Sequence, residues 1–150
     1  PSGSLPPAGV ATSSTVTPPP TGLAAPPPTA QATAVPVATP CARAQAGDMV
    51  LAGADLSGCD LAGLTLTGDF AGANLVAADL TGATLTMLDL SGAKLTGTKL
   101  TGATISTTSF DRGLLTGAIF TGATVTDSSF VGASMAPATL NDAHVSDCTF

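Results

Sequence analysis

Residues 78–82 read Ala-Asp-Leu-Thr-Gly, and most of the chain after them restates these five residues. From Phe70 to Phe150 every fifth position is apolar without a break. We call these apolar positions centres. A small residue lies two positions before most centres, and glycine recurs two positions after them. This period of five residues decides the fold.

A five-residue period fits neither a regular helix nor a flat strand. On an α-helix a step of five residues turns the side chain by roughly 140°, so the centres would spread around the cylinder. On a strand an odd step sends successive side chains to opposite faces. The centres stay on one side only if the chain turns a corner in every repeat, and glycine permits such turns. Four corners close a coil, and stacked coils form a solenoid in which each repeat buries its centre against its neighbours.

Three segments resemble a known repeat unit. Ala-Asp-Leu-Ser-Gly (54–58), Ala-Asn-Leu-Val-Ala (73–77) and Ala-Asp-Leu-Thr-Gly (78–82) resemble the A(D/N)LXX unit of pentapeptide-repeat proteins, and the resemblance covers about residues 49–150. It implies an all-β fold, a right-handed quadrilateral β-helix, with the centre and the small residue two before it pointing inward. Functions in this family are diverse, so the resemblance implies little about activity.

The chain divides into two parts by composition. Eleven of the twelve prolines lie in residues 1–40, and the first charged residue is Arg43. Dense proline favours extended polyproline II, so residues 1–46 are predicted to be a Pro/Ala/Thr-rich linker or stalk. A semi-rigid spacer, a glycosylated stalk and a strap that orders against a partner all remain open. Residues 47–150 are predicted to form the β-helix, with about five coils and a length of roughly 25 Å.

Two features of the centres make specific predictions. The step from Leu66 to Phe70 is four residues instead of five. We expect this deletion to fall at a corner and to distort one turn without moving later centres outward. Centres twenty residues apart should share a face, which places four of the five phenylalanines in one internal column. That column is predicted to contain Phe70, Leu90, Phe110, Phe130 and Phe150.

The neighbouring face is expected to carry hydroxyls on its outer side. Its centres are flanked by Thr or Ser in four successive coils, and by His144 and Ser146 in the next. The predicted hydroxyl positions are Thr65, Thr67, Thr84, Thr86, Thr104, Ser106, Thr124 and Thr126. Threonine suits strands and stabilises stacked neighbours, which accounts for such columns on structural grounds. The pattern is also similar to the flat Thr-x-Thr faces of β-helical antifreeze proteins, so ice or another ordered surface is an alternative ligand.

The three cysteines leave two alternatives open. Cys59 and Cys148 both occupy the small inward position, more than four coils apart, which is beyond the reach of a disulfide. A free thiol filling an alanine-sized niche is the expectation for Cys148. Cys41 lies just before the first coil, where it either stays free or forms a disulfide with Cys59 in an oxidising compartment.

Catalytic chemistry has little support in the sequence. His144 is the only histidine and should point outward, whereas Cys148 should point inward, and the chain has no glutamate. Aspartates before centres are interpreted as corner and surface residues. No phosphate-binding loop or metal-ligand spacing stands out. We therefore expect a non-enzyme that uses no cofactor and no metal.

The charge pattern bears on partners. The formal net charge is −6, with 9% charged residues. The best-known activity of the resembling family is DNA mimicry toward type II topoisomerases, which requires a continuous acidic face. Here Lys94, Lys99 and Arg112 interrupt the acids, so this is the third hypothesis, and nucleic acid is not an expected partner. No apolar run of about 18 residues occurs, so no membrane span is predicted.

The two ends of the chain suggest its context. It begins with Pro1 rather than Met, which indicates a processed chain or a fragment, and with the stalk this favours a secreted or surface-attached bacterial protein. Phe150 is a centre with no capping residue after it, so apolar side chains and unpaired backbone groups should be exposed there. Phe130, Leu140, Val145 and Phe150 are the candidate end-stacking interface for a protein partner or a second copy. The first hypothesis is a non-enzymatic scaffold within an oligomer or filament.

Overall fold

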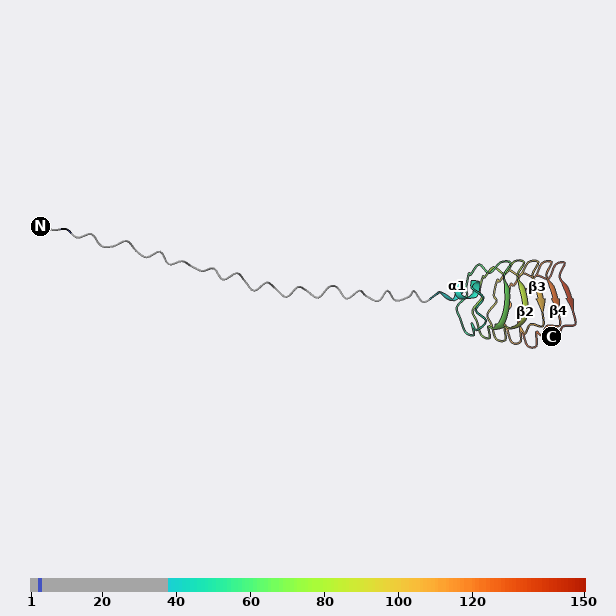
Figure 1. The fold of residues 1–150 in the computed structure, drawn as a ribbon. Helices are drawn as coiled ribbons and strands as arrows, with labels where there is room; N and C mark the ends of the chain where they lie inside the picture. Colours follow the sequence, from blue (N-terminus) through green and yellow to red (C-terminus); the bar gives the residue numbers. More distant parts are fainter. Residues whose placement is uncertain (1–2, 4–37) are drawn as a thin grey trace. The chain divides into compact units, whose positions relative to one another are not determined.

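The structure is a computed structural model that describes Gly3 and residues 38–150 (Figure 1). Most of the predicted linker, residues 1–46, lies outside the described residues, and the boundary at residue 46 remains a prediction. A short helix precedes five strands that pair in parallel in the order of the chain. The elements are α1 (Pro40–Gln45), β1 (Thr65–Asp69), β2 (Thr84–Asp89), β3 (Thr104–Ser106), β4 (Thr124–Thr126) and β5 (His144–Ser146).

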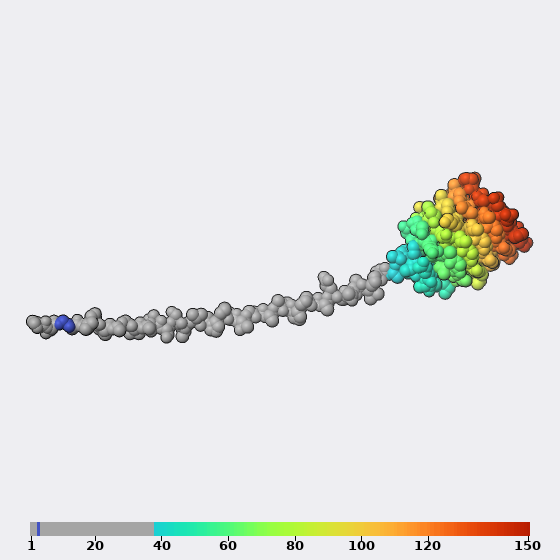
Figure 2. Space-filling model, turned by 90° about the horizontal axis from the view of Figure 1, so that it is seen from above, coloured from blue at the N-terminus to red at the C-terminus, as the bar shows by residue number. Residues whose placement is uncertain are grey.

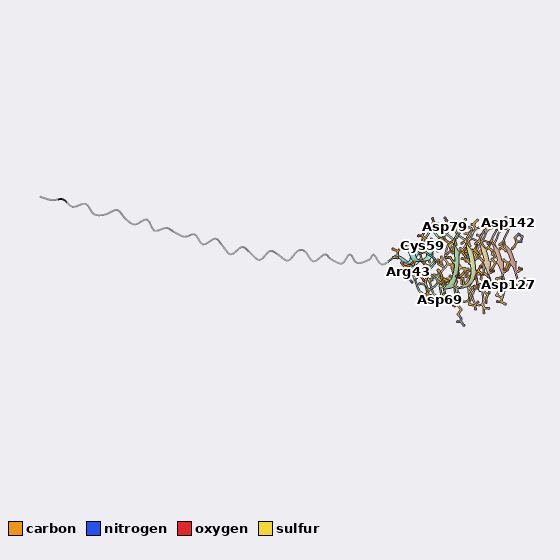
Figure 3. The ribbon with its side chains drawn as sticks, in the orientation of Figure 1. Arg43, Cys59, Asp69, Asp79, Asp127 and Asp142 are labelled. Carbon is orange, nitrogen blue, oxygen red and sulfur yellow. A yellow bond between two sulfur atoms is a disulfide. The ribbon has the colours of Figure 1, made fainter. Side chains whose placement is uncertain are left out.

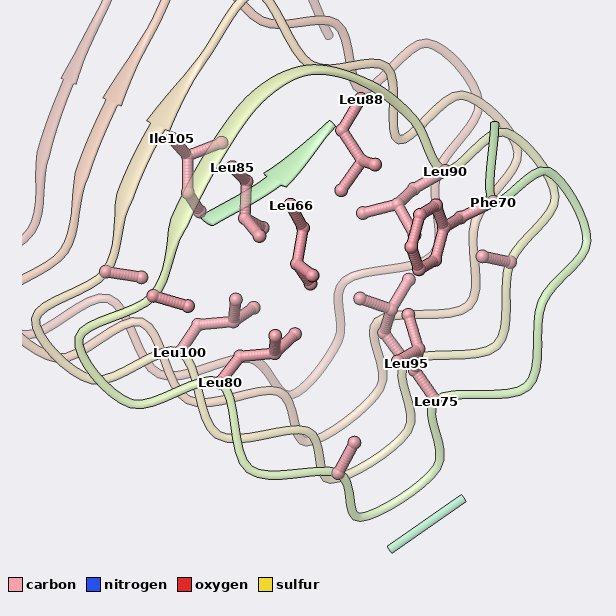
Figure 4. Close-up of a cluster of buried hydrophobic side chains, with 14 of the residues drawn as sticks. Leu66, Phe70, Leu75, Leu80, Leu85, Leu88, Leu90, Leu95, Leu100 and Ile105 are labelled. Atoms are coloured by element: carbon pink, nitrogen blue, oxygen red, sulfur yellow. The ribbon is translucent and has the colours of Figure 1, made fainter. Parts of the chain in front are cut away.

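The strands form one side of a four-sided coil. Isolated parallel bridges hold the other three sides, as between Asp55 and Asn74 and between Asp60 and Asp79. Figure 4 shows centres pointing into the quadrilateral from its sides, among them Leu75, Leu80 and Leu85. The fold is therefore the all-parallel β-helix that the five-residue period predicted, and the resemblance to the pentapeptide-repeat architecture is confirmed.

The core consists of the centres and the small residues between them. Every centre from Leu51 to Phe130 is at most 4% exposed. Alanines such as Ala73 and Ala78 fill the niche beside the centres and are fully buried. At most corners glycine adopts a left-handed backbone, as at Gly82 with φ 66°, which a residue with a Cβ adopts only at a cost.

The four-residue step lies in β1 and is absorbed by a bulge. Pairing runs in register from Thr65 with Thr84, and then shifts so that Gly68 faces Leu88. Gly68 has φ +102°, and a Cβ there would collide with the carbonyl oxygen of Met49. Only glycine fits this turn without movement of the backbone. Phe70, the next centre, is still buried at 1% exposure, so the later centres keep their orientation as predicted.

The predicted aromatic column forms where phenylalanines occupy successive coils. The rings of Phe110 and Phe130 stack with centroids 4.8 Å apart, and those of Phe130 and Phe150 stack at 5.3 Å. Leu90 separates this stack from Phe70 in the same column. Phe120 belongs to another face and meets Phe110 edge-on at 6.4 Å.

Candidate interaction surfaces

Helix α1 covers the N-terminal end of the solenoid. Thr39 accepts a hydrogen bond from the Ala42 amide at 3.3 Å, and Pro40 lies in the first turn, where its missing N–H costs nothing. Ala44 faces the coil and is 1% exposed. Six residues are too few for a stable isolated helix, so contacts with the first coil hold α1 in place. This helix was not predicted from the sequence.

Side chains of α1 satisfy backbone groups at the outer edge of the first coil. Arg43 Nη2 donates to the Val50 carbonyl oxygen at 3.2 Å, and Gln45 Nε2 donates to the Asp60 carbonyl oxygen at 2.9 Å. Arg43 also pairs with Asp48 at 2.6 Å, and Asp48 accepts the Val50 amide at 3.1 Å. The bond from the Val50 amide, followed by the Arg43 guanidinium, lowers the pKa of Asp48 below its usual 3.8. Three backbone groups that a preceding coil would pair are thus occupied: the amide and carbonyl of Val50 and the carbonyl of Asp60.

A disulfide between Cys41 and Cys59 joins α1 to the first coil, with their Cα atoms 5.6 Å apart. Figure 3 labels Cys59 close to Arg43 of α1. Cys59 occupies the inward niche and is 3% exposed, whereas Cys41 is half-buried. Of the two alternatives that the sequence left open, the structure contains the disulfide. Cys148 is free and half-buried, because no further coil lies beside it among the described residues.

The C-terminal coil presents apolar side chains that interior coils bury. Leu140 is 44% exposed, Val145 is 41% exposed and Phe150 is 71% exposed. With Met135 they surround a shallow apolar hollow whose floor includes Phe130. Figure 2 shows these C-terminal residues at the end of the solenoid opposite α1. The structure therefore brings together the four residues of the candidate end-stacking interface.

The hydroxyl face forms two columns along the sheet β1–β5. The first column runs through Thr65, Thr84, Thr104 and Thr124 to His144, in register. Thr67 falls in the register shift of β1, where it does not pair with a residue of β2, and its place on the hydroxyl face remains a prediction. The second column consists of Thr86, Ser106, Thr126 and Ser146.

Sequence analysis missed a polar groove at the corner that follows these strands. Here non-glycine residues adopt left-handed backbone in successive coils, at Met87, Thr107, Asp127 and Asp147, with φ between 49° and 53°. The residue after each points inward, and Ser128 there donates to the carbonyl oxygen of Thr126 at 2.8 Å. The signal was present in the sequence, since positions twenty apart carry Thr108, Ser128 and Cys148 in place of the usual alanine. The groove is lined by Thr107, Thr108, Ser109, Asp127, Ser128, Ser129, Asp147 and Thr149.

Aspartates before centres serve the corners, as the sequence predicted. Asp55 accepts the Ser57 amide at 3.1 Å, and Asp79 accepts the Thr81 amide at 3.0 Å. The side chains of Ser57 and Thr81, followed by these amide bonds, lower the pKa of the two carboxyls below 3.8. Asp79 also pairs with Lys99 at 3.6 Å. The column of Asp60 and Asp79 ends at Lys99, and that of Asp69 and Asp89 ends at Ser109, so no continuous acidic face forms along the described coils.

Other chemistry is sparse in the part of the chain that the structure describes. His144 is exposed on the hydroxyl face and Cys148 lies in the core niche of the same coil. Within residues 38–150 no three His, Cys, Asp or Glu side chains come together as metal ligands. No helix among these residues is long and apolar enough to cross a membrane.

Comparison with known proteins settles the family. Eight copies of the family pattern "Pentapeptide repeats" match residues 73–112. A pentapeptide repeat protein from the Arabidopsis thaliana thylakoid lumen is 36% identical to the chain. The match covers 62% of this chain and 69% of that protein, with a TM-score of 0.38. The chain belongs to the pentapeptide repeat family.

Other pentapeptide repeat structures are more distant. The plasmid-mediated fluoroquinolone resistance protein QnrB1 is 21% identical over 64% of this chain and 60% of its own, with a TM-score of 0.46. HetL from the cyanobacterium Nostoc, a pentapeptide repeat protein involved in heterocyst differentiation regulation, is 21% identical over 63% of this chain and 61% of its own, with a TM-score of 0.35. No curated protein matches the chain by sequence. The comparisons identify a pentapeptide repeat protein and leave its own activity to be proposed.

Proposed function

We propose that this chain is a non-enzymatic interaction module whose C-terminal coil binds the C-terminal coil of a second copy. The observation that supports the proposal is the exposure of residues that the repeat makes centres. Phe150 is 71% exposed, whereas Phe110 and Phe130 in the same column are buried. Removing apolar surface from water contributes about 25 cal/mol per Å², so covering this coil is favourable.

The proposed contact joins two identical C-terminal ends, because α1 covers the N-terminal end of each copy. Helix α1 and the disulfide close the N-terminal edge, and the C-terminal edge is open among the described residues. Two copies that meet through their open ends use the same patch on both sides, which gives a closed dimer. Leu140, Val145 and Phe150 of each copy would then be buried together.

Sedimentation velocity tests this proposal directly. We expect the chain to sediment as a dimer at micromolar concentration, and Phe150→Ser to shift it to monomer. Thr101→Ser, at an exposed position of an interior coil, is the matched control and should leave the dimer intact. A monomeric unmodified chain, or a Phe150→Ser variant that remains dimeric, would contradict the proposal.

The module is proposed to work outside the cytoplasm, as a secreted or surface-attached subunit of a larger assembly. The Cys41–Cys59 disulfide supports this location, since disulfides persist in oxidising compartments. The net charge of −6 keeps the apolar C-terminal coil soluble until it meets its partner.

Binding of ice or another ordered surface is the second candidate function. The in-register columns on the sheet favour it, because Thr84, Thr104 and Thr124 repeat at the spacing of stacked strands, roughly 4.8 Å. Thr104→Tyr should abolish thermal hysteresis with unchanged circular dichroism. Thr81→Tyr, exposed on another face, is the control and should retain the activity. Absence of thermal hysteresis in the unmodified chain would exclude this function.

A further inference from the structure

The centres of the first coil are buried as deeply as those of an interior coil. These centres, Leu51, Leu56 and Leu61, are at most 1% exposed, although no coil precedes them in the described residues. Helix α1 takes the place of that coil, with Ala44 against the core. Beneath the helix lies an apolar end surface of the same kind as the one that the C-terminal coil exposes.

The carbonyl groups that α1 occupies are those that a preceding coil would use. Inside the solenoid, Phe130 N–H donates to the Thr149 carbonyl oxygen and Phe120 N–H donates to that of Thr139, both at 2.7 Å. The next rungs of these two ladders would join Phe150 N–H to the Val50 carbonyl and Leu140 N–H to the Asp60 carbonyl. Val50 and Asp60 are the two residues whose carbonyls Arg43 and Gln45 now cover.

The donors for these rungs are available on the C-terminal coil. Among the described residues, neither Phe150 N–H nor Leu140 N–H has a backbone acceptor. A second copy that stacks its C-terminal coil on the first coil would therefore extend both ladders and bury its exposed centres against Leu51, Leu56 and Leu61. Helix α1 is the element in the way.

A single covalent bond secures that helix, and the solenoid itself does not depend on it. Cys59 fills a niche that holds alanine at Ala78 and Ala118 and a free thiol at Cys148. A reduced Cys59 therefore fits the first coil without rearrangement. Once the bond is broken, α1 retains the packing of Cys41 and Ala44 against the core and the side-chain bonds of Arg43 and Gln45.

We propose that reduction of the Cys41–Cys59 disulfide releases α1 and opens the first coil to the C-terminal coil of a second copy. The chain then assembles head to tail into an open stack instead of a closed dimer. This inference rests on the proposed function in one respect, that the C-terminal coil is an interaction surface.

The reductant is a dithiol. Its thiolate attacks Cys41 Sγ, the more accessible sulfur, which forms a mixed disulfide and leaves Cys59 as a thiolate that takes up a proton. The second thiol of the reductant then displaces Cys41 as a thiol and closes a cyclic disulfide. Two electrons and two protons pass to the chain, which gains two thiols.

The test uses variants without thiols, so that oxidation cannot crosslink the copies. The reference is Cys148→Ser, which keeps the Cys41–Cys59 bond. The uncapped variant adds Cys41→Ser and Cys59→Ala to it. We expect the reference to sediment at one mass, and the uncapped variant to form species larger than a dimer whose mass rises with concentration. Phe150→Ser added to the uncapped variant should abolish that growth.

The outcomes separate this inference from the proposed function. If the reference is a dimer and the uncapped variant forms nothing larger, this inference is overturned and the proposed function stands. A monomeric reference together with an uncapped variant that grows overturns the symmetric dimer and supports the head-to-tail stack. Growth that persists with Phe150→Ser overturns the inference, because the C-terminal coil would then not be the contact.

Hydrogen exchange of the unmodified chain covers the case in which the uncapped variant does not fold. On addition of dithiothreitol, we expect amides of residues 51–64 to exchange at least tenfold faster in dilute solution, where stacking is minimal. Amides of residues 95–125 should be unchanged. Faster exchange in both segments would mean that the disulfide holds the whole solenoid, and no change in either would mean that α1 stays in place. Either result would overturn the proposal.

Discussion

The first and last coils of the solenoid occupy the same positions in the repeat and have different surroundings. Leu61 and Leu140 are centres of the same face, yet Leu61 is fully buried and Leu140 is 44% exposed. The difference comes from α1, which covers one end, because no further coil covers the other end among the described residues. Burial in this fold is thus a property of the neighbour that a coil has, since each repeat packs only against the adjacent ones.

The aromatic column offers the largest expected contrast. Phe110→Ala should lower the free energy of unfolding by about 3–5 kcal/mol, because the interior coils cannot collapse into the cavity. In solution dilute enough to dissociate the proposed dimer, Phe150→Ala should cost no more than about 1 kcal/mol, since that side chain is 71% exposed in the single chain. Urea denaturation of both variants measures the difference. Equal losses would mean that the last coil is covered in solution.

The leucines of the two end coils test whether α1 is as good a cover as a coil. Leu61→Ala should cost about 2–5 kcal/mol, as for an interior centre. In the same dilute solution, Leu140→Ala should cost less than about 1 kcal/mol, because that side chain is partly exposed in the single chain. The same urea titration applies. If Leu61→Ala proves as mild as Leu140→Ala, α1 does not seal the first coil.

Substitutions at two glycines of the N-terminal half distinguish the cost of a left-handed backbone from the cost of a steric collision. Gly58→Ala meets nothing within 4 Å and should cost about 1–2 kcal/mol for its left-handed backbone alone. Gly68→Ala should cost more, because its Cβ would also collide with the Met49 carbonyl. Thermal unfolding of the pair gives the order. A milder effect at Gly68 would show that Met49 moves aside freely.

Acid should loosen the N-terminal cap, with the smallest effect of the four. Because the folded-state pKa of Asp48 lies below 3.8, its contribution is fully present above that pH and is lost as pH falls through the lowered value. Exchange of the Val50 amide should therefore quicken in acid. Asp79→Asn, on an interior corner, is the control and should not alter this behaviour, whereas Asp48→Asn should weaken the pH dependence.

Much of this fold could be predicted from the sequence because its constraint is local and repeated. Each centre needs an apolar side chain and each corner a left-handed residue, so the period alone places Leu80 inside and Gly82 at a turn. The four-residue step before Phe70 was equally visible. These positions are fixed by packing, and packing leaves a direct trace in residue type.

What the sequence did not predict depends on tertiary contacts. Helix α1 spans too few residues to show a helical period, and Ala44 and the disulfide decide its place. The left-handed corner at Asp127 carries no glycine to mark it. Candidate binding surfaces are harder still to predict, because outward residues such as Thr104 are free of core constraints. The sequence pattern of a binding face therefore differs little from that of an ordinary stable strand.

The phenylalanine stack also gives this protein an internal optical reporter. The chain has no tryptophan and no tyrosine, so its near-ultraviolet signal comes chiefly from five phenylalanines, all at or after residue 70. Three of them form the stack of Phe110, Phe130 and Phe150, with adjacent rings within 10° of parallel. The phenylalanine bands of the near-ultraviolet circular dichroism spectrum therefore report mainly on the C-terminal half. An event confined to α1 and the first coil will appear there only through the broad band of the Cys41–Cys59 disulfide, and any event at the C-terminal coil will be visible without a label.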